Sequence, residues 1–150
     1  MRRIIDALAR ILELTLALAL IGAVLLNFVN VIGRYGFGTT MTIADELQTY
    51  IMVWIAFLGA AVVTWRGVHL RMDVIAQRLP LSLQKFLLWI EAALILVLGS
   101  LVTWVAWQYV AQMYSLGAKS QTAGIPMWMP HSALLVGFAL IVAASLLRQK

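Results

Sequence analysis

The 150-residue sequence contains no cysteine, only two histidines and three prolines, and few charged residues. Without cysteine, the chain has no disulfides, thiolate metal sites or cysteine nucleophiles. Charged residues make up 11% of the chain, whereas soluble domains carry about a quarter. Apolar residues make up 63%, and the mean hydropathy is +0.95. A domain of this size cannot hide so much apolar surface from water, which excludes a soluble enzyme and a disordered chain.

The few charges divide the chain into four long neutral runs of 20, 19, 27 and 28 residues. Because a helix rises about 1.5 Å per residue, about 20 residues cross a hydrocarbon core about 30 Å thick. The runs lack the period-2 alternation of membrane barrel strands. The sequence therefore predicts an all-α integral membrane protein, a single domain of two helical hairpins forming a four-helix bundle. The four transmembrane helices are expected at about 12–33, 47–65, 88–114 and 128–147.

The basic residues are distributed unevenly between the two sides that these spans define. One side carries nine of them, which are Arg2, Arg3, Arg10, Arg66, Arg71, Arg78, Lys85, Arg148 and Lys150. The other side carries only Arg34 and Lys119. The positive-inside rule predicts that both termini lie in the cytoplasm. The net charge of +5 is thereby interpreted as a topology signal and as contact with membrane lipid, not with nucleic acid.

The N-terminal segment is interpreted as part of a retained first span, because charges interrupt its start and its apolar run continues to Gly33. Its beginning is amphipathic, with four charged residues on one helical face: Arg3, Asp6, Arg10 and Glu13. Such a segment can lie along the cytoplasmic interface before the chain enters the membrane.

Polar residues gather at the outer end of the first predicted helix. Asn27, Asn30 and Arg34 follow at i, i+3 and i+7, so they share one face. Polar groups in a membrane normally turn toward protein. Two interpretations remain open, which are packing within the four-helix bundle and contact with another subunit.

Asp45 and Glu46 open the second predicted helix on the outer side. Thr42 is a candidate N-cap, with Asp45 three residues later in the manner of a capping box. Acidic residues also suit the positive end of the helix dipole. The alternatives are a salt bridge from these acids to Arg34, a surface for a soluble external partner, and an ion or substrate site.

The remaining titratable residues do not form a recognisable catalytic or cofactor site. Glu13 and Glu91 lie near the inner ends of their helices and are interpreted as interfacial acids. His69 and His131 fall on opposite sides of the membrane, which argues against haem ligation and zinc binding. We therefore predict no catalytic residue, no metal and no cofactor.

Almost no charge lies inside the predicted spans, which makes the chain a poor transporter by itself. An auxiliary subunit of a larger membrane protein fits better. The alternative is an autonomous four-span exporter acting as a dimer, which needs an essential carboxylate deep in the membrane. Glu13 is the nearest candidate, but it lies close to Arg10 and to the inner interface.

Five segments carry a family resemblance, in order along the chain: 30–37 (NVIGRYGF), 45–47 (DEL), 54–61 (WIAFLGAA), 66–73 (RGVHLRMD) and 125–128 (IPMW). Together they resemble the small permease subunit, of DctQ type, of tripartite ATP-independent periplasmic (TRAP) transporters. The resemblance covers nearly the whole chain. One departure is Ile43, which stands where many members have a tryptophan.

The resemblance implies a multi-pass subunit of the bacterial inner membrane that takes part in the import of organic acids. In such systems a periplasmic solute-binding protein delivers the substrate, and a large multi-span permease carries it by symport with an ion. The small subunit is expected to scaffold the permease and to help dock the binding protein. The residues expected at partner interfaces are Asn27, Asn30, Arg34, Asp45, Glu46, Arg66, His69 and Asp73.

Overall fold

The computed structural model describes residues 2–39, 41–67 and 80–148, and these form four α-helices. The helices are α1 (Arg2–Gly36), α2 (Thr42–Arg66), α4 (Leu81–Ser115) and α5 (Trp128–Arg148). Each contains a stretch long and apolar enough to cross a membrane. The predicted all-α membrane architecture with four spans is therefore confirmed.

The helix α1 is continuous from Arg2 to Gly36, without a break between the amphipathic segment and the apolar span. Leu, Ala and Arg make up most of its first half, and all three favour helix. Its 35 residues correspond to a length of about 52 Å, which exceeds the hydrocarbon thickness. The N-terminal segment thus prolongs the first span along the same axis and does not form a separate helix at an angle to it.

The two ends of α2 differ in how their backbone groups are satisfied. At the C-terminal end, Gly67 adopts a left-handed conformation with φ of 68°, and its N–H donates to the carbonyls of Val63 and Thr64. At the N-terminal end, Met41 occupies the cap position without a side-chain cap bond. The predicted capping box was therefore wrong, because Thr42 is already helical and the Asp45 carboxylate is bound by side chains of α1.

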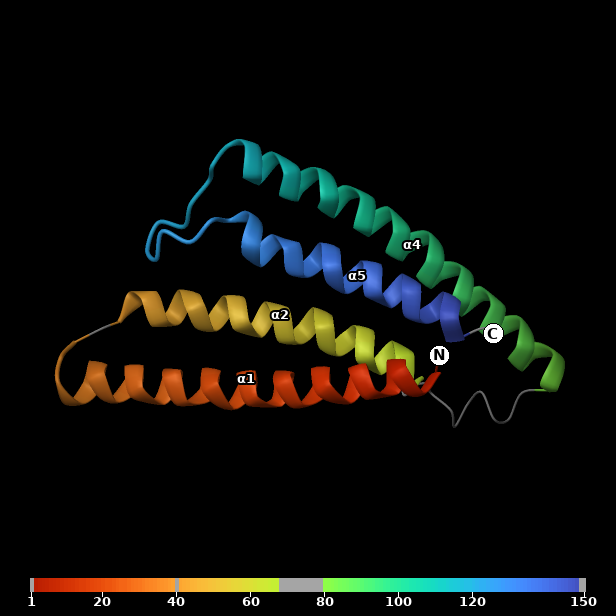
Figure 1. Ribbon diagram of the computed structural model, residues 1–150, viewed down its shortest axis with the longest axis horizontal. Coiled ribbons are helices and arrows are strands. Elements are labelled where there is room, and N and C mark those ends of the chain that lie inside the picture. Colours follow the sequence, from red (N-terminus) through yellow and green to blue (C-terminus); the bar gives the residue numbers. More distant parts are fainter. Residues whose placement is uncertain (1, 40, 68–79, 149–150) are drawn as a thin grey trace.

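The four helices lie side by side in a single layer, in the order α1, α2, α5, α4 (Figure 1). Each hairpin of the sequence, α1 with α2 and α4 with α5, packs as predicted, and α2 packs against α5 between them. The helices do not close into the bundle that we expected. In lipid, apolar surface need not be covered by protein, so the hydrophobic effect gives no reason for closure.

Both ends of the described chain lie at the same end of the layer, near Arg2 and Arg148 (Figure 1). The opposite end, called here the loop end, contains the connection from α1 to α2 and the loop 116–127.

Small residues form the contacts between neighbouring helices. Most of the buried apolar residues are alanines, among them Ala23 on α1, Ala61 on α2 and Ala133 on α5. Within the described part of the chain, no large side chain is fully buried. Large apolar side chains instead point away from the layer, such as Leu18 on α1 at 69% exposure and Trp89 on α4 at 76%. Small residues at the contacts allow close backbone approach, which is how helices associate in lipid.

The closest approach of α2 and α5 is at Gly137. A Cβ atom built on Gly137 meets the Cβ of Phe57 at 2.5 Å and the carbonyl oxygen of Phe57 at 3.1 Å. No side chain fits there without moving the backbone. The rings of Phe57 and Phe138 pack beside this contact with centroids 5.9 Å apart.

We expect Gly137→Ala to lower the free energy of unfolding by about 1–3 kcal/mol, because overpacking forces the two backbones apart. The matched control is Gly22→Ala, since an added Cβ at Gly22 meets nothing within 4 Å. Alanine favours helix over glycine by about 0.5–1 kcal/mol, so the control should be neutral or stabilising. Unfolding of the purified chain in mixed micelles, followed by circular dichroism, measures both. Equal effects of the two substitutions would contradict the close approach.

Candidate interaction site at the loop end

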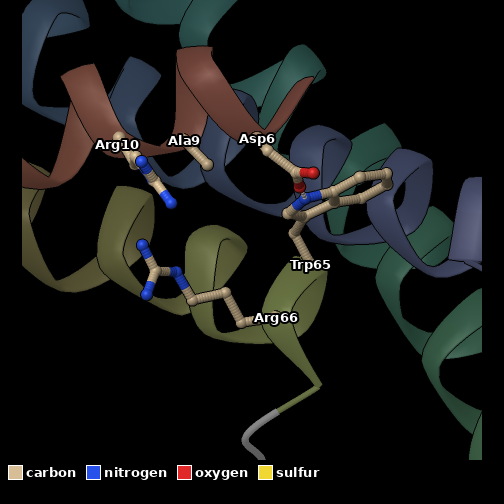
Figure 2. A pocket seen from close by; sticks show the side chains of 5 residues that line it. All are labelled: Asp6, Ala9, Arg10, Trp65 and Arg66. Atoms are coloured by element: carbon tan, nitrogen blue, oxygen red, sulfur yellow. Dashed lines mark hydrogen bonds between the residues drawn. The ribbon is translucent and has the colours of Figure 1, made fainter. Parts of the chain in front are cut away.

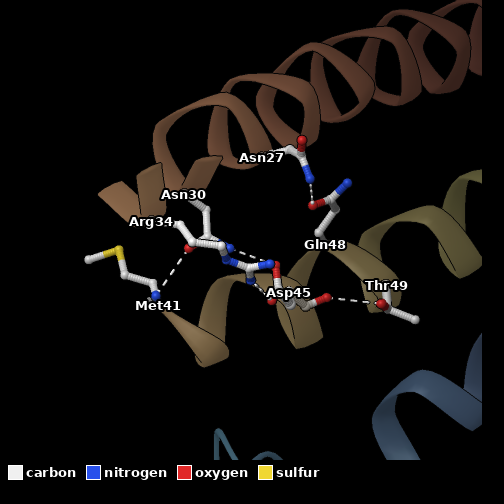
Figure 3. Close-up of polar contacts among 7 residues, drawn as sticks. All are labelled: Asn27, Asn30, Arg34, Met41, Asp45, Gln48 and Thr49. Atoms are coloured by element: carbon white, nitrogen blue, oxygen red, sulfur yellow. Dashed lines mark hydrogen bonds and ion pairs between the residues drawn. The ribbon is translucent and has the colours of Figure 1, made fainter. Parts of the chain in front are cut away.

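The most buried polar residue of the loop end is Asn30, whose exposure is only 4%. Its amide donates to Oδ1 of Asp45 at 2.6 Å, and its Oδ1 accepts the backbone N–H of Met41 at 3.0 Å (Figure 3). Asn30 thereby fixes both the first turn of α2 and the residue before it. Because a buried amide without partners is costly, this arrangement defines the entry of the chain into α2.

Two further contacts continue along the same faces of α1 and α2 (Figure 3). Arg34 donates to Oδ2 of Asp45 at 3.1 Å, with 47% and 49% of the two side chains exposed. Asn27 donates to Oε1 of Gln48 at 2.9 Å. The salt bridge from Asp45 to Arg34, one of the alternatives from the sequence, is present. Packing within the chain accounts for the contacts of Asn27, Asn30 and Arg34 in this structure.

Glu46 points to the other neighbour of α2. It accepts the hydroxyl hydrogen of Tyr50 on one oxygen, and the backbone N–H of Ala123 on the other at 3.0 Å. The Tyr50 oxygen also lies 3.5 Å from the sulfur of Met127. Glu46 therefore connects α2 to the loop between α4 and α5. The sequence analysis missed this link, although the i, i+4 spacing of Glu46 and Tyr50 was a visible sign of their contact.

The loop 116–127 is held in a hairpin-like turn by its own polar groups. The backbone of Ser120 donates to Ile125 at 2.8 Å, and that of Met127 donates to Ala118 at 2.9 Å. The Ser120 hydroxyl oxygen accepts the N–H groups of Ala123 and Ile125, both at 3.2 Å. Its single basic residue, Lys119, is exposed. The loop therefore presents a defined surface at the loop end.

A second set of contacts connects α1 and α2 at the opposite end. Arg66 forms an ion pair with Glu13, and the indole N–H of Trp65 donates to Asp6 at 2.9 Å. The predicted neighbour of Glu13 was Arg10, so its partner here is a different arginine. Two further predicted site residues, His69 and Asp73, lie outside the described residues.

These contacts join the helices to one another. In the described part of the chain, they do not form a recognisable catalytic site. In the described ranges, no three residues among His, Asp and Glu come together as a metal site. His131 lies with its Nδ1 2.5 Å from the carbonyl oxygen of Met127 and stacks near Tyr109, with ring centroids 5.0 Å apart. This histidine is thus part of the packing between α4 and α5.

We expect Asn30→Ala to lower the free energy of unfolding by about 1–3 kcal/mol, because it leaves the Met41 N–H and an Asp45 oxygen without a partner. Asn27→Ala is the matched control, since Asn27 is exposed and water or lipid headgroups can replace its contact. Titration of the purified chain with denaturing detergent compares the two. An Asn27 variant that loses as much stability would show that burial of Asn30 is not decisive.

Comparison with known proteins gives a consistent result. The family described as "Tripartite ATP-independent periplasmic transporters, DctQ component" matches residues 23–149. A putative TRAP transporter small permease protein of Haemophilus influenzae is 27% identical over 124 residues, which are 83% of this chain and 76% of that protein. The C4-dicarboxylate TRAP transporter small permease protein DctQ of Rhodobacter capsulatus is 26% identical over 104 residues, 69% of this chain and 46% of the relative.

A third relative is much longer than this chain. The isethionate TRAP transporter permease protein DctMQ of Oleidesulfovibrio alaskensis is 26% identical over 97 residues, which are 65% of this chain but only 15% of that protein. Members of the family are components of transporters and not enzymes. Since the family match extends over most of the sequence, from within α1 to the end of α5, this chain belongs to the DctQ family, the small permease subunits of TRAP transporters.

Proposed function

We propose that this chain is the scaffold subunit of a TRAP-type importer of the bacterial inner membrane, with both termini in the cytoplasm. It braces the large permease, which moves an organic acid together with an ion, and it helps to dock the periplasmic solute-binding protein. The single observation that carries the scaffold role is the open layer of four helices, whose two apolar faces this chain leaves uncovered (Figure 1).

The open layer favours a membrane partner over lipid alone. In the most apolar stretch of α4, only 6% of the residues are buried by other parts of the chain. In the most apolar stretch of α1, this share is 11%. Lipid can cover these faces, but an apolar groove of about 560 Å³ also runs along α1, α2 and the start of α5. In the DctMQ relative, the matched segment of 97 residues is only 15% of the protein. This supports the view that a sequence of this kind can be joined to a larger permease in one polypeptide.

The polar groups are placed for bracing and not for conduction. The described ion pairs lie near the ends of α1 and α2, in the pairs Arg34–Asp45 and Arg66–Glu13. Between them, residues 14–33 and 47–65 carry no charge. The middle of these spans therefore has no charged group that could bind an ion or an organic acid on its way across the membrane. Substrate transport therefore belongs to the large permease in this proposal.

The loop end is the proposed side for the periplasmic binding protein. Asn27, Asn30, Arg34 and Asp45 hold α1 to α2 there, and Glu46 holds the loop 116–127. These contacts give the surface a fixed shape. The half-exposed pair of Arg34 and Asp45, with exposed Lys119 nearby on the loop, supplies charge for a soluble partner. Arg66 lies at the opposite end, and it is proposed to contact the cytoplasmic side of the permease. The same role is proposed from the sequence for His69 and Asp73, which lie outside the described residues.

The first expectation concerns the chain by itself. Liposomes containing only this chain should show no uptake of organic acids under an ion gradient, because its spans lack charge in the middle. Coexpressed with its large permease, the chain should copurify at a fixed stoichiometry in mild detergent. Uptake by the chain alone, abolished by Glu13→Gln, would instead support an autonomous transporter and overturn the scaffold proposal.

The second expectation concerns docking of the binding protein. Lys119→Glu reverses an exposed charge at the loop end without touching the described polar contacts of Asp45 and Glu46. In the reconstituted complex, this change should lower uptake about several-fold at limiting binding protein and less at saturating binding protein, because surface charges act mainly on association.

Lys85→Glu is the matched control for this experiment. Lys85 is equally an exposed lysine, but it lies in the first turns of α4, at the end of the layer that carries the termini (Figure 1). Its reversal should leave the dependence on binding protein unchanged. Equal loss of uptake in both variants would point to general surface charge, and no loss in either would remove Lys119 from the docking surface.

A further inference from the structure

A pocket of about 410 Å³ lies between α1 and α2 at the end of the layer that carries the termini. Asp6, Ala9 and Arg10 line it from α1, and Trp65 and Arg66 line it from α2 (Figure 2). We call it the arginine pocket, because two arginines from different helices form opposite walls. It is separate from the polar contacts of the loop end.

The carboxylates near the arginine pocket form an ion pair with only one of its two arginines, although Asp6 also lines the pocket. Arg66 is paired with Glu13, and Asp6 accepts the indole N–H of Trp65 at 2.9 Å. Among the described residues, Arg10 has no ion-pair or hydrogen-bond partner. Figure 2 shows its guanidinium pointing across the pocket toward that of Arg66. Two like charges that face one another near the membrane repel, unless an anion lies between them.

The chemistry of the walls selects a phosphate group as that anion. Guanidinium groups bind phosphate oxygens through paired N–H donors, with better geometry than an ammonium group offers. Tryptophan is enriched at the level of lipid headgroups, and Trp65 forms part of the pocket wall. Basic pockets between transmembrane helices on the cytoplasmic side bind anionic headgroups. Further basic residues at this end, among them Arg3 and Lys85, add to the positive potential.

We propose that the arginine pocket binds the phosphate group of an anionic phospholipid, with Arg10 and Arg66 donating to its oxygens from opposite sides. The phosphate gives Arg10 an ion-pair partner, while Glu13 keeps its contact with Arg66 and Asp6 keeps its contact with Trp65. The lipid headgroup then connects α1 to α2 at the end opposite the Asn30 contacts. This inference rests on the proposed orientation, in which this end of the layer lies on the cytoplasmic side, and not on the proposed transport role.

The test uses the purified full chain in an uncharged detergent and titrates it by calorimetry with short-chain lipids. Dihexanoyl phosphatidylglycerol is the anionic probe, dihexanoyl phosphatidylcholine the zwitterionic one, and inorganic phosphate the free anion. We expect saturable binding of the phosphatidylglycerol and at least about tenfold weaker binding of the phosphatidylcholine, whose choline group repels the arginines. Binding of inorganic phosphate as tight as that of the phosphatidylglycerol would overturn the lipid assignment.

Three variants separate a specific site from general attraction. Arg10→Gln should weaken binding of phosphatidylglycerol at least about tenfold, because it removes a charge-assisted donor. Arg3→Gln, which removes the same charge from the same helix outside the pocket, should change it less than about twofold. Glu13→Gln should strengthen binding, because it frees Arg66 from its competing carboxylate.

The Glu13 variant keeps the test decisive even where a pocket arginine is needed for folding. A gain in lipid affinity by Glu13→Gln supports the proposal when Arg3→Gln leaves the affinity nearly unchanged, because unspecific attraction would respond to both changes of charge. Equal weakening by Arg3→Gln and Arg10→Gln would overturn it in favour of unspecific attraction. Absence of saturable binding to a chain that retains its helical circular dichroism would overturn it as well.

Discussion

The structure depends on one constraint, which is that four helices in a single layer cannot cover their own apolar faces. Alanine and glycine at the contacts, such as Ala61, Ala133 and Gly137, bring neighbouring backbones close. The larger side chains are thereby directed outward, to lipid or to a partner. A protein built in this way needs a membrane for its stability. Its two apolar faces are available for contact with a larger membrane protein. This is the physical basis of the proposed scaffold role.

Packing of small residues does not by itself fix the register of neighbouring helices or the positions of their ends. Polar contacts near the helix ends fix both. Consecutive residues on a helix point about 100° apart, so Asp45 and Glu46 reach different neighbours of α2. Asp45 binds Asn30 and Arg34 of α1, and Glu46 binds the backbone of the loop 116–127. The acidic pair thus couples α1, α2 and the loop 116–127 at the loop end. Such coupling favours binding of a soluble partner, because a surface that is already ordered loses less conformational entropy on binding.

The opposite end is arranged differently. Arg66 and Glu13 form one link between α1 and α2, but Arg10 has no ion-pair partner among the described residues. Protein groups alone satisfy the described polar contacts of the loop end, whereas the arginine pocket is suited to an anion from the bilayer. The two ends of the same helix pair therefore differ in how their charged groups are paired among the described residues.

The sequence by itself determined the all-α membrane class and the four spans, because each run without charge is long enough for a helix to cross the hydrocarbon core. It also determined the shared face of Asn27, Asn30 and Arg34, which follows from helical periodicity. Tertiary structure decided the open layer in place of a bundle, the partner of each acid, and the facing of Arg10 and Arg66. Periodicity fixes the face of a helix on which a residue lies. It does not fix which helix packs on that face, because in lipid this depends on the steric fit of side chains distant in sequence.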